Sequence, residues 1–331
     1  MKNQLCLLSL SCSVLFACGA SNPSDSMDQR ARNAIPTADT VAMKPPTASV
    51  AASRSAHPDS SVGDASVFLG DTVHLATVVN GAIVSTLHLI KSITDLPATS
   101  CTTTSCTWGP GALATDPVSW QLVVTESAGT FDYTLSGQAK VGGDGQMHPI
   151  IIGSATPSVL PHRGSGSFSF DFSEAKVLNP MNTQVGKLDV TYSNATVGAA
   201  TIDATFLGTL DEAHPPQTDN AAYAYAEDGH LGGTLQIAVR NLTSGDLVSL
   251  ESRWASTGAG RSDVSVTVHD GSGGHYSATE SECWANATST SPLPYHVVFF
   301  TSSDPAHLGA DSGSASDCAF PTAQQTSLTA P

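Results

Sequence analysis

The chain has 331 residues, of which 29 are acidic and 13 basic, so its formal net charge at pH 7 is −16. Such a charge excludes nucleic acid as a partner, because the phosphates would repel the protein. Hydrophobic residues make up 40% of the chain and charged residues only 13%. The chain can therefore bury a large core, and its length suits one large domain.

The N-terminal stretch has the composition of a secretion signal. Lys2 is its early charge, and residues 5–16 are apolar apart from Ser and Cys. This run is too short to span a bilayer. It ends in Leu-Phe-Ala-Cys at residues 15–18, which resembles the lipobox of bacterial lipoprotein precursors. The resemblance implies that residues 1–17 are a signal peptide and that cleavage makes Cys18 the first mature residue.

The same resemblance implies that Cys18 carries a diacylglycerol on its sulfur and an acyl chain such as palmitate on its amine. Several acyl chains anchor a protein stably, whereas one chain binds a membrane only marginally. Gly19 and Ala20 follow without an acidic residue, and in this family that order implies a lipid anchor in the outer membrane, on its periplasmic face or at the cell surface. An ordinary secretory signal with a chance cysteine is the alternative.

Two segments have compositions typical of disorder. Residues 18–65 are rich in Ala, Ser, Thr and Pro and show no periodic apolar face. Such a segment buries too little apolar surface to offset its ordering entropy, so we predict a lipidated flexible tether. Residues 319–331 are expected to form a disordered tail. These limits leave residues 66–318 as a single β-rich domain.

The domain begins with a segment that fits two structures. Val-Val-Asn-Gly-Ala-Ile is typical of a hairpin that turns at Asn80-Gly81. Apolar residues at helical spacing instead favour a helix over residues 72–94, with Asp71 as its N-cap and Pro97 beyond its end. The apolar side comprises Leu75, Val78, Val79, Ala82, Ile83, Leu87, Ile90 and Ile93, and the polar side comprises His74, Thr77, Ser85, His88, Lys91 and Ser92.

From Trp108 onward the apolar residues alternate with polar ones. "SWQLVVTES", "SFSFDF" and "TLQIAVRN" show the pattern, and short Gly-rich connections such as "SAGT" separate the segments. Strands with one apolar and one polar face are typical of antiparallel sheets. We therefore predict a mainly β (α+β) fold, an antiparallel meander of about ten strands. Accumulated twist should curl it into an open or half-closed barrel around the N-terminal helix, which we expect to fill the interior.

This layout is similar to the lipoprotein-carrier half-barrels of the bacterial envelope, in which a sheet wraps around a helical lid and an apolar cavity. The chain also resembles large envelope lipoproteins of Gram-negative bacteria without an assigned activity, through phrases such as "TWGPG" and "GSGSFSFDF". The first resemblance implies that the interior binds an apolar ligand. A membrane barrel is the rival fold, but few aromatic residues are present for its two girdles.

Four cysteines remain after the signal is removed: Cys101, Cys106, Cys283 and Cys318. An even number in an oxidising compartment predicts two disulfides, for which three pairings exist. "CTTTSC" brings Cys101 and Cys106 within reach of each other through one turn, so we favour local pairing and a second bond between the other two. Zinc is the alternative, although Cys283 and Cys318 do not form the close pair that such sites use.

Arg253, Trp254, Arg261 and Asp263 form the one polar cluster that we single out. The two arginines flank "STGAG", so a hairpin turn would bring them together. They would form either a cationic patch or an intramolecular Arg/Asp pair. We predict no catalytic residues, no metal ligands and no cofactor, since "HDGSGGH" reads as a turn flanked by polar residues, and "GADSGSAS" lacks the strand-to-helix elbow of serine hydrolases.

These observations predict a non-catalytic envelope lipoprotein, structural or partner-binding, that could hold an apolar ligand. Its partners would be the membrane, through the N-terminal lipid, and a lipid or a protein. A membrane-anchored hydrolase with scattered catalytic residues is the alternative.

Overall fold

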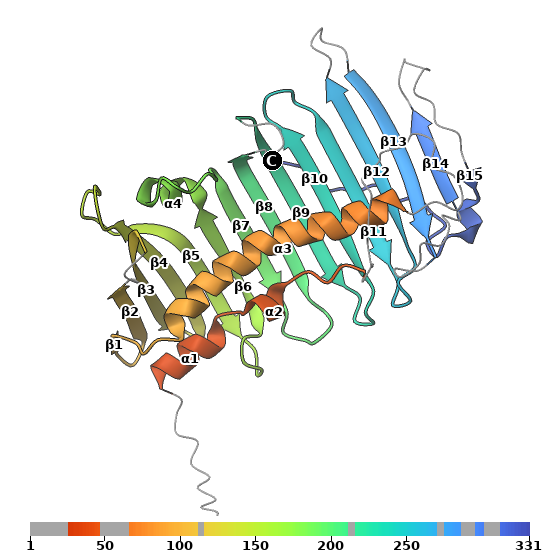
Figure 1. Ribbon diagram of the computed structural model, residues 1–331. Coiled ribbons are helices and arrows are strands. Elements are labelled where there is room, and N and C mark those ends of the chain that lie inside the picture. Colours follow the sequence, from red (N-terminus) through yellow and green to blue (C-terminus); the bar gives the residue numbers. More distant parts are fainter. Residues whose placement is uncertain are drawn as a thin grey trace, which may run out of the picture.

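The computed structural model describes residues 26–46, 66–111, 116–210, 216–269, 275–285, 295–300 and 312–331. They form one antiparallel sheet whose strands follow each other in chain order from β1 to β15 (Figure 1). Each strand pairs with the strands before and after it, and β1 and β15 are not joined. The predicted meander and its open form are confirmed, and the described strands outnumber the expected ten.

The strands are β1 (Ser100–Cys101), β2 (Ser105–Gly111), β3 (Val118–Ser127), β4 (Thr130–Ala139), β5 (His148–Pro157), β6 (Gly164–Asp171), β7 (Lys187–Ser193), β8 (Thr201–Leu210), β9 (Thr218–Glu227), β10 (Gly233–Asn241), β11 (Leu247–Trp254), β12 (Gly260–His269), β13 (His275–Trp284), β14 (Tyr295–Phe300) and β15 (Ser312–Gly313). The helices are α1 (Met27–Ala34), α2 (Ala38–Val41), α3 (Val67–Thr94) and α4 (Phe172–Leu178), and a 3-10 helix spans Ala315–Asp317.

The helix α3 lies across one face of the sheet, which we call the inner face (Figure 1). Because side chains alternate between the two faces of a strand, the cross-strand register fixes which residues share the inner face. One register row of that face is apolar from β2 to β12. It consists of Trp108, Leu122, Leu135, Ile151, Phe170, Leu188, Phe206, Ala221, Val239, Val248 and Val266.

The predicted helix is confirmed, and the alternative hairpin at Asn80-Gly81 is wrong. However, α3 begins at Val67, five residues before the predicted start at residue 72, and Ser66 rather than Asp71 is its N-cap. The Ser66 side chain accepts the Leu69 N–H at 3.1 Å. Other N–H groups of the first turn donate to the carboxylate of Glu282 on β13. The early start therefore depends on a strand that is distant in sequence.

One stripe of α3 packs into the sheet. Ala76, Val79, Ile83, Leu87 and Ile90 are at most 1% exposed, as helical spacing predicts for one face of an amphipathic helix. The side chains predicted to be polar and outward are exposed. By length and composition α3 could also cross a membrane, but here its apolar stripe is buried against the sheet.

Residues 26–46 lie along the ends of the strands at which the β5–β6, β7–β8 and β9–β10 hairpins turn (Figure 1). We call this end of the sheet the proximal end and the opposite one the distal end. His162 Nδ1 donates to the Ile35 carbonyl at 2.9 Å, Asn194 donates to the Thr40 carbonyl at 2.6 Å, and Lys44 pairs with Glu227 at 2.8 Å. Each hairpin thus has its own contact with the N-terminal segment.

The prediction of a flexible tether is therefore wrong for residues 26–46. The small and apolar side chains of this segment do bury surface once the sheet is present, although no long apolar stripe marks them in the sequence. The buried residues of the segment are Met27, Ala31, Ala34, Ile35, Ala38, Val41 and Met43. The remainder of the predicted tether, which includes Cys18, lies outside the described residues.

The predicted disordered tail is also wrong, because residues 319–331 are described and contact the outer face of the sheet. Asn220 donates to the carbonyl of Pro331 at 2.8 Å, and Thr326 donates to Gln236 at 3.1 Å. Ala330 is 4% exposed. The domain therefore includes segments on both sides of the predicted limits of 66 and 318.

Both predicted disulfides are present. Cys101–Cys106 joins β1 to β2, and Cys283–Cys318 joins β13 to the start of the C-terminal segment. The local pairing is confirmed, and zinc coordination by these four residues is wrong because each sulfur is bonded to another.

Candidate functional site

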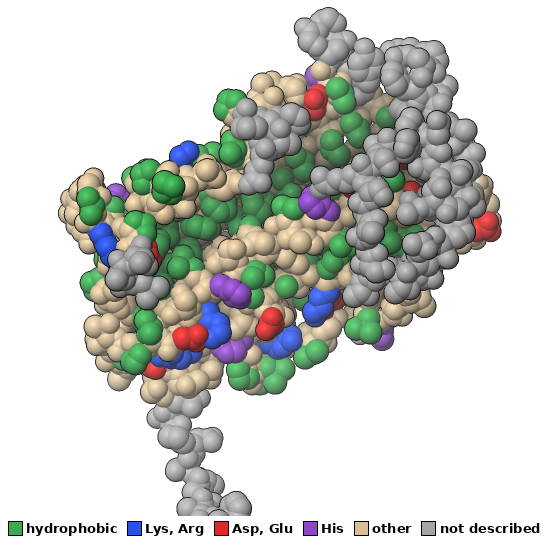
Figure 2. Space-filling view, in the orientation of Figure 1, with side chains coloured by type: hydrophobic (Ala, Val, Ile, Leu, Met, Phe, Trp, Pro, Cys, Tyr) green, Lys and Arg blue, Asp and Glu red, His purple; other side chains and the backbone are tan. Residues whose placement is uncertain are grey.

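The inner face of the sheet is only partly covered by α3. Figure 2 shows hydrophobic side chains at the surface between α3 and the distal end of the strands. Phe170, Phe206 and Val239 of the apolar row are partly buried there, and Val248 is 44% exposed. The expectation that the helix fills the interior is thus not met, since an apolar groove remains beside it.

The helix itself supplies one wall of this groove. At 100° per residue, Leu75, Ala82, Leu89 and Ile93 fall on one flank of α3, and all four are only partly buried. On the other flank, Asn80 accepts the Met43 N–H at 2.8 Å and donates to the Met43 carbonyl at 2.9 Å. Because the N-terminal segment occupies that flank, the apolar flank faces the open part of the sheet.

The short helix α4 lies at the distal end of the sheet (Figure 1), directly after Phe170 and Asp171 of β6. Asp171 caps it by accepting the Glu174 N–H at 2.9 Å. Its Leu178 lies against Gly137 and Trp120, and a Cβ at Gly137 would come within 2.7 Å of both side chains. Only glycine therefore allows α4 to sit this close to β4.

A pocket of about 290 Å³ lies between α4 and β6, where it extends the groove. Phe170 and Phe172 form part of its wall, with ring centroids 4.6 Å apart, and Met181 at its rim is 85% exposed. The groove and this pocket therefore present a mainly apolar surface, suited to an apolar chain rather than to a charged ligand.

The structure brings together three of the four residues of the predicted polar cluster. On the outer face, Asp263 accepts from Arg261 at 2.8 Å and from Arg253 at 3.0 Å. The backbone N–H of Gln324 donates to the same carboxylate at 3.0 Å. Because Arg261 is 2% exposed, the intramolecular Arg/Asp pair is confirmed and the exposed cationic patch is wrong.

The fourth residue of that cluster, Trp254, lies on the inner face. It follows Arg253 directly on β11, so alternation places the two side chains on opposite faces. The Trp254 ring stacks on Tyr225 with centroids 6.2 Å apart. Trp254 is therefore part of the core and does not belong to the arginine cluster.

The sequence reasoning missed a buried carboxylate on the inner face. Glu282 is 1% exposed and accepts from the Ser66 hydroxyl at 2.7 Å, the Val67 N–H at 3.2 Å and the Phe68 N–H at 2.7 Å. Burial raises the pKa of Glu282 to about 7, against the opposing effect of these donors. One feature of the sequence could have revealed this carboxylate. Glu282 lies on the same face of β13 as Trp284, and alternation predicts an apolar side chain at such an inward-facing position.

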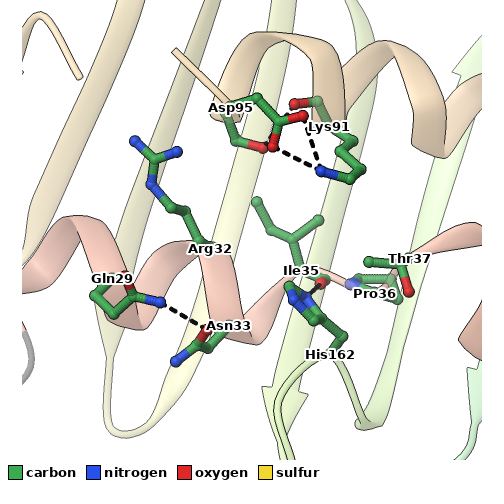
Figure 3. A pocket seen from close by; sticks show the side chains of 10 residues that line it. Gln29, Arg32, Asn33, Ile35, Pro36, Thr37, Lys91, Asp95 and His162 are labelled. Atoms are coloured by element: carbon green, nitrogen blue, oxygen red, sulfur yellow. Dashed lines mark hydrogen bonds and ion pairs between the residues drawn. The ribbon is translucent and has the colours of Figure 1, made fainter. Parts of the chain in front are cut away.

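A small pocket of about 160 Å³ separates α1 from the C-terminal end of α3 (Figure 3). Its polar side chains bond to one another or to the backbone. Lys91 pairs with Asp95 at 2.7 Å, and Gln29 donates to Asn33 at 2.9 Å. Both of these pairs are local. Arg32 donates to the Leu96 carbonyl at 2.8 Å and His162 to the Ile35 carbonyl at 2.9 Å, which links the N-terminal segment to the end of α3 and to the β5–β6 turn, so we assign this pocket a structural role.

A larger pocket of about 340 Å³ lies at the proximal end, near Lys44, Tyr225 and Glu227. The Tyr225 hydroxyl accepts the Lys44 N–H at 3.0 Å. Burial alone would raise the pKa of Glu227, but hydrogen bonds from Lys44 and from the Ala200 N–H hold it below its usual value. This carboxylate stays charged and holds the last described part of the N-terminal segment in place.

In the described part of the chain, no group of three or more His, Cys, Asp or Glu side chains could hold a metal ion. His269 and His275 are opposite each other on β12 and β13, and His269 Nδ1 lies 3.7 Å from Asp246. The side chains of His275 and Ser312 lie outside the described residues.

No protein-family model matches this chain, and neither a curated protein nor a solved structure was found that matches it.

Proposed function

We propose that this protein is a non-catalytic envelope lipoprotein, anchored through Cys18 at the outer membrane, that binds the acyl chain of a lipid in the groove beside α3. One observation carries the proposal: the apolar row of the inner face continues from Phe170 on β6 to Val248 on β11 without a polar side chain, and part of it is open to solvent. Contiguous exposed apolar surface of this kind marks ligand grooves and interaction sites.

The dimensions of the groove support an acyl chain as the ligand. Neighbouring strands lie about 4.8 Å apart, so the apolar row from β6 to β11 spans about 24 Å, with Leu188 and Ala221 buried and the other members partly exposed. This length is comparable to that of a long-chain acyl group laid across the strands. The pocket between α4 and β6 lies at one end of this path, where it would receive the terminal part of the chain.

A titration with a fluorescent long-chain fatty acid tests the proposal, with the unlipidated Cys18→Ser protein to avoid the contribution of the anchor. Val248→Asp places a charge on the groove floor and should weaken binding at least tenfold. Ile152→Asp is the matched control, because Ile152 is 55% exposed but faces outward next to the buried Ile151. The control should bind like the wild type.

A second variant narrows the groove without adding charge. Ala82→Phe enlarges a side chain on the apolar flank of α3 and should also weaken binding. Native mass spectrometry of the gently purified wild type should show one bound lipid. Absence of binding by the wild type, or equal binding by all variants, would contradict the proposal.

The proposed anchor has its own test. Cys18→Ser should leave the precursor uncleaved or release an unacylated protein into the soluble fraction. Normal processing and membrane retention of this variant would contradict the lipobox prediction, and recovery of the wild type in inner-membrane fractions would contradict the outer-membrane location. Turnover of ester or glycoside substrates that a single substitution abolishes would contradict the non-catalytic assignment.

A further inference from the structure

Three neighbouring hairpins expose a large apolar side chain at the proximal end of the sheet. Val159 in the β5–β6 connection is 99% exposed, Val197 in the β7–β8 connection is 67% exposed, and Leu231 in the β9–β10 connection is 86% exposed. Successive hairpins on one end of a meander are two strands apart, or about 10 Å. Val159, Val197 and Leu231 are therefore arranged in a row along the proximal end of the sheet.

The position of the proposed anchor points to the same end of the sheet. The helix α1 begins there, since Arg30 in its first turns donates to the Thr103 carbonyl at 3.2 Å and pairs with Glu126 at 2.7 Å. Both partners lie at the β1–β2 and β3–β4 turns of the proximal end. At most about 29 Å of fully extended chain separates Cys18 from Ser26, the N-cap of α1.

The charges at this end are mixed: several basic side chains pair with acids, and exposed Asp39 and Asp228 lie there too, within a chain that carries −16 overall. Figure 2 shows Lys and Arg side chains, with Asp and Glu side chains among them, on the proximal side of α3. Three ion pairs balance acids there: Arg30 with Glu126, Lys44 with Glu227 and Arg32 with Asp28. The lysine of the second pair is 59% exposed.

We propose that the proximal end of the sheet rests on the lipid bilayer that holds the anchor, with Val159, Val197 and Leu231 inserted among the lipid headgroups. Apolar side chains at an interface gain from burial in this region, and an acyl anchor nearby keeps the local concentration of lipid high. The distal end also exposes apolar side chains, among them Val141, Val177 and Met181, so the position of the anchor, rather than apolar exposure alone, selects the proximal end. This inference rests on the proposed lipidation of Cys18 and is independent of ligand binding in the groove.

Fluorescence quenching in vesicles tests the orientation. Single variants Val159→Cys, Leu231→Cys and Val141→Cys of the lipidated protein would each be labelled with an environment-sensitive fluorophore. Selective labelling is feasible because Cys101, Cys106, Cys283 and Cys318 are bonded in pairs. The protein is then reconstituted in phosphatidylethanolamine and phosphatidylglycerol vesicles that contain spin-labelled lipid.

We expect the two proximal probes to be quenched at least twofold and the Val141→Cys probe to remain unquenched. A second set, in which Val159→Ser and Leu231→Ser accompany a labelled Val197→Cys, should lose at least half of the quenching of the single Val197→Cys variant. Equal quenching at both ends, or none at the proximal end, would overturn the proposal. A mass spectrum of the mature protein without acyl chains would overturn the proposal as well. Failure of the unlipidated protein to bind fatty acid would instead contradict only the proposed ligand binding in the groove.

Discussion

The carboxylate of Glu282 accepts the backbone N–H of Phe68 at 2.7 Å, across more than two hundred residues of chain. It thereby supplies a negative charge and acceptor oxygens to the N-terminus of α3, where N–H groups lack partners within the helix. The same carboxylate is almost fully buried, next to Glu280, which raises its pKa further. The contact therefore favours the helix start but costs free energy to keep charged.

Stability should depend on pH through Glu282. Its pKa in the folded protein is raised to about 7 from an ordinary value of 4.5, so the folded state holds a proton that the unfolded state has lost between these values. The free energy of unfolding should then fall as the pH rises from about 4.5 to about 7, by up to about 1.4 kcal/mol per unit. Denaturant titrations at several pH values would measure this slope, which Glu282→Gln should remove. An unchanged slope in the variant would assign the dependence to other groups.

The buried stripe of α3 and its solvent-exposed side should respond differently to truncation of a side chain. Ile83 is fully buried against the sheet, so Ile83→Ala should lower the free energy of unfolding by about 2–5 kcal/mol through lost burial and a residual cavity. Val78, five residues away, is 50% exposed, and Val78→Ala should change it by no more than about 0.5 kcal/mol. Urea unfolding of both variants gives the comparison. Similar costs would mean that α3 is not docked as described.

Two buried tyrosines of the inner face differ in their hydroxyl partners. Tyr133 is 1% exposed, and its hydroxyl has no hydrogen-bond partner among the described residues. We expect Tyr133→Phe to leave the free energy of unfolding unchanged or to raise it by about 1 kcal/mol, since an unsatisfied polar group is removed. Tyr225→Phe should lower it by about 1 kcal/mol, because the Lys44 N–H loses its acceptor. Thermal unfolding of the pair checks this order, and a reversed order would refute it.

Removal of Asp263 should free the C-terminal segment. Asp263 is the common partner of two arginines and of the Gln324 N–H, so Asp263→Ala removes an acceptor that all three donors share. A loss of about 3–5 kcal/mol is expected for breaking a buried ion pair on one side only. Limited proteolysis should then cleave after residue 319 faster than in the wild type. The variant Asp203→Ala, on β8, is a control that should leave the cleavage rate unchanged.

The strands and the buried face of each strand could be predicted from the sequence, because the alternation of apolar and polar residues is a local pattern that does not depend on distant parts of the chain. The same rule would have separated Trp254 from Arg253 had it been applied to β11. The start of α3 could not be predicted in this way. Its N-terminus is fixed by Glu282, and no local pattern around Ser66 shows that such a partner exists.

The two terminal segments were mispredicted for a related reason. A helix as short as α1 or α2 is unstable in isolation, and the small and polar residues of this segment resemble the composition of a linker. Contacts with distant hairpins, such as that of Asn194 with the Thr40 carbonyl, order the N-terminal segment. The groove was missed because a helical period indicates only that one stripe of the helix is buried, whereas the width of uncovered sheet beside the helix depends on the length of the strands that it crosses.

The order of the strands has a consequence for the way in which the chain assembles. Because every described strand pairs with its sequence neighbours, the sheet can grow by one hairpin at a time, with little loop-closure entropy to overcome at each step. The N-terminus of α3 is an exception, since its partner Glu282 arrives only with β13. The first long helix of the chain is thus completed by one of the last strands, and a chain truncated before β13 would keep its early hairpins but lose the capping contact of this helix.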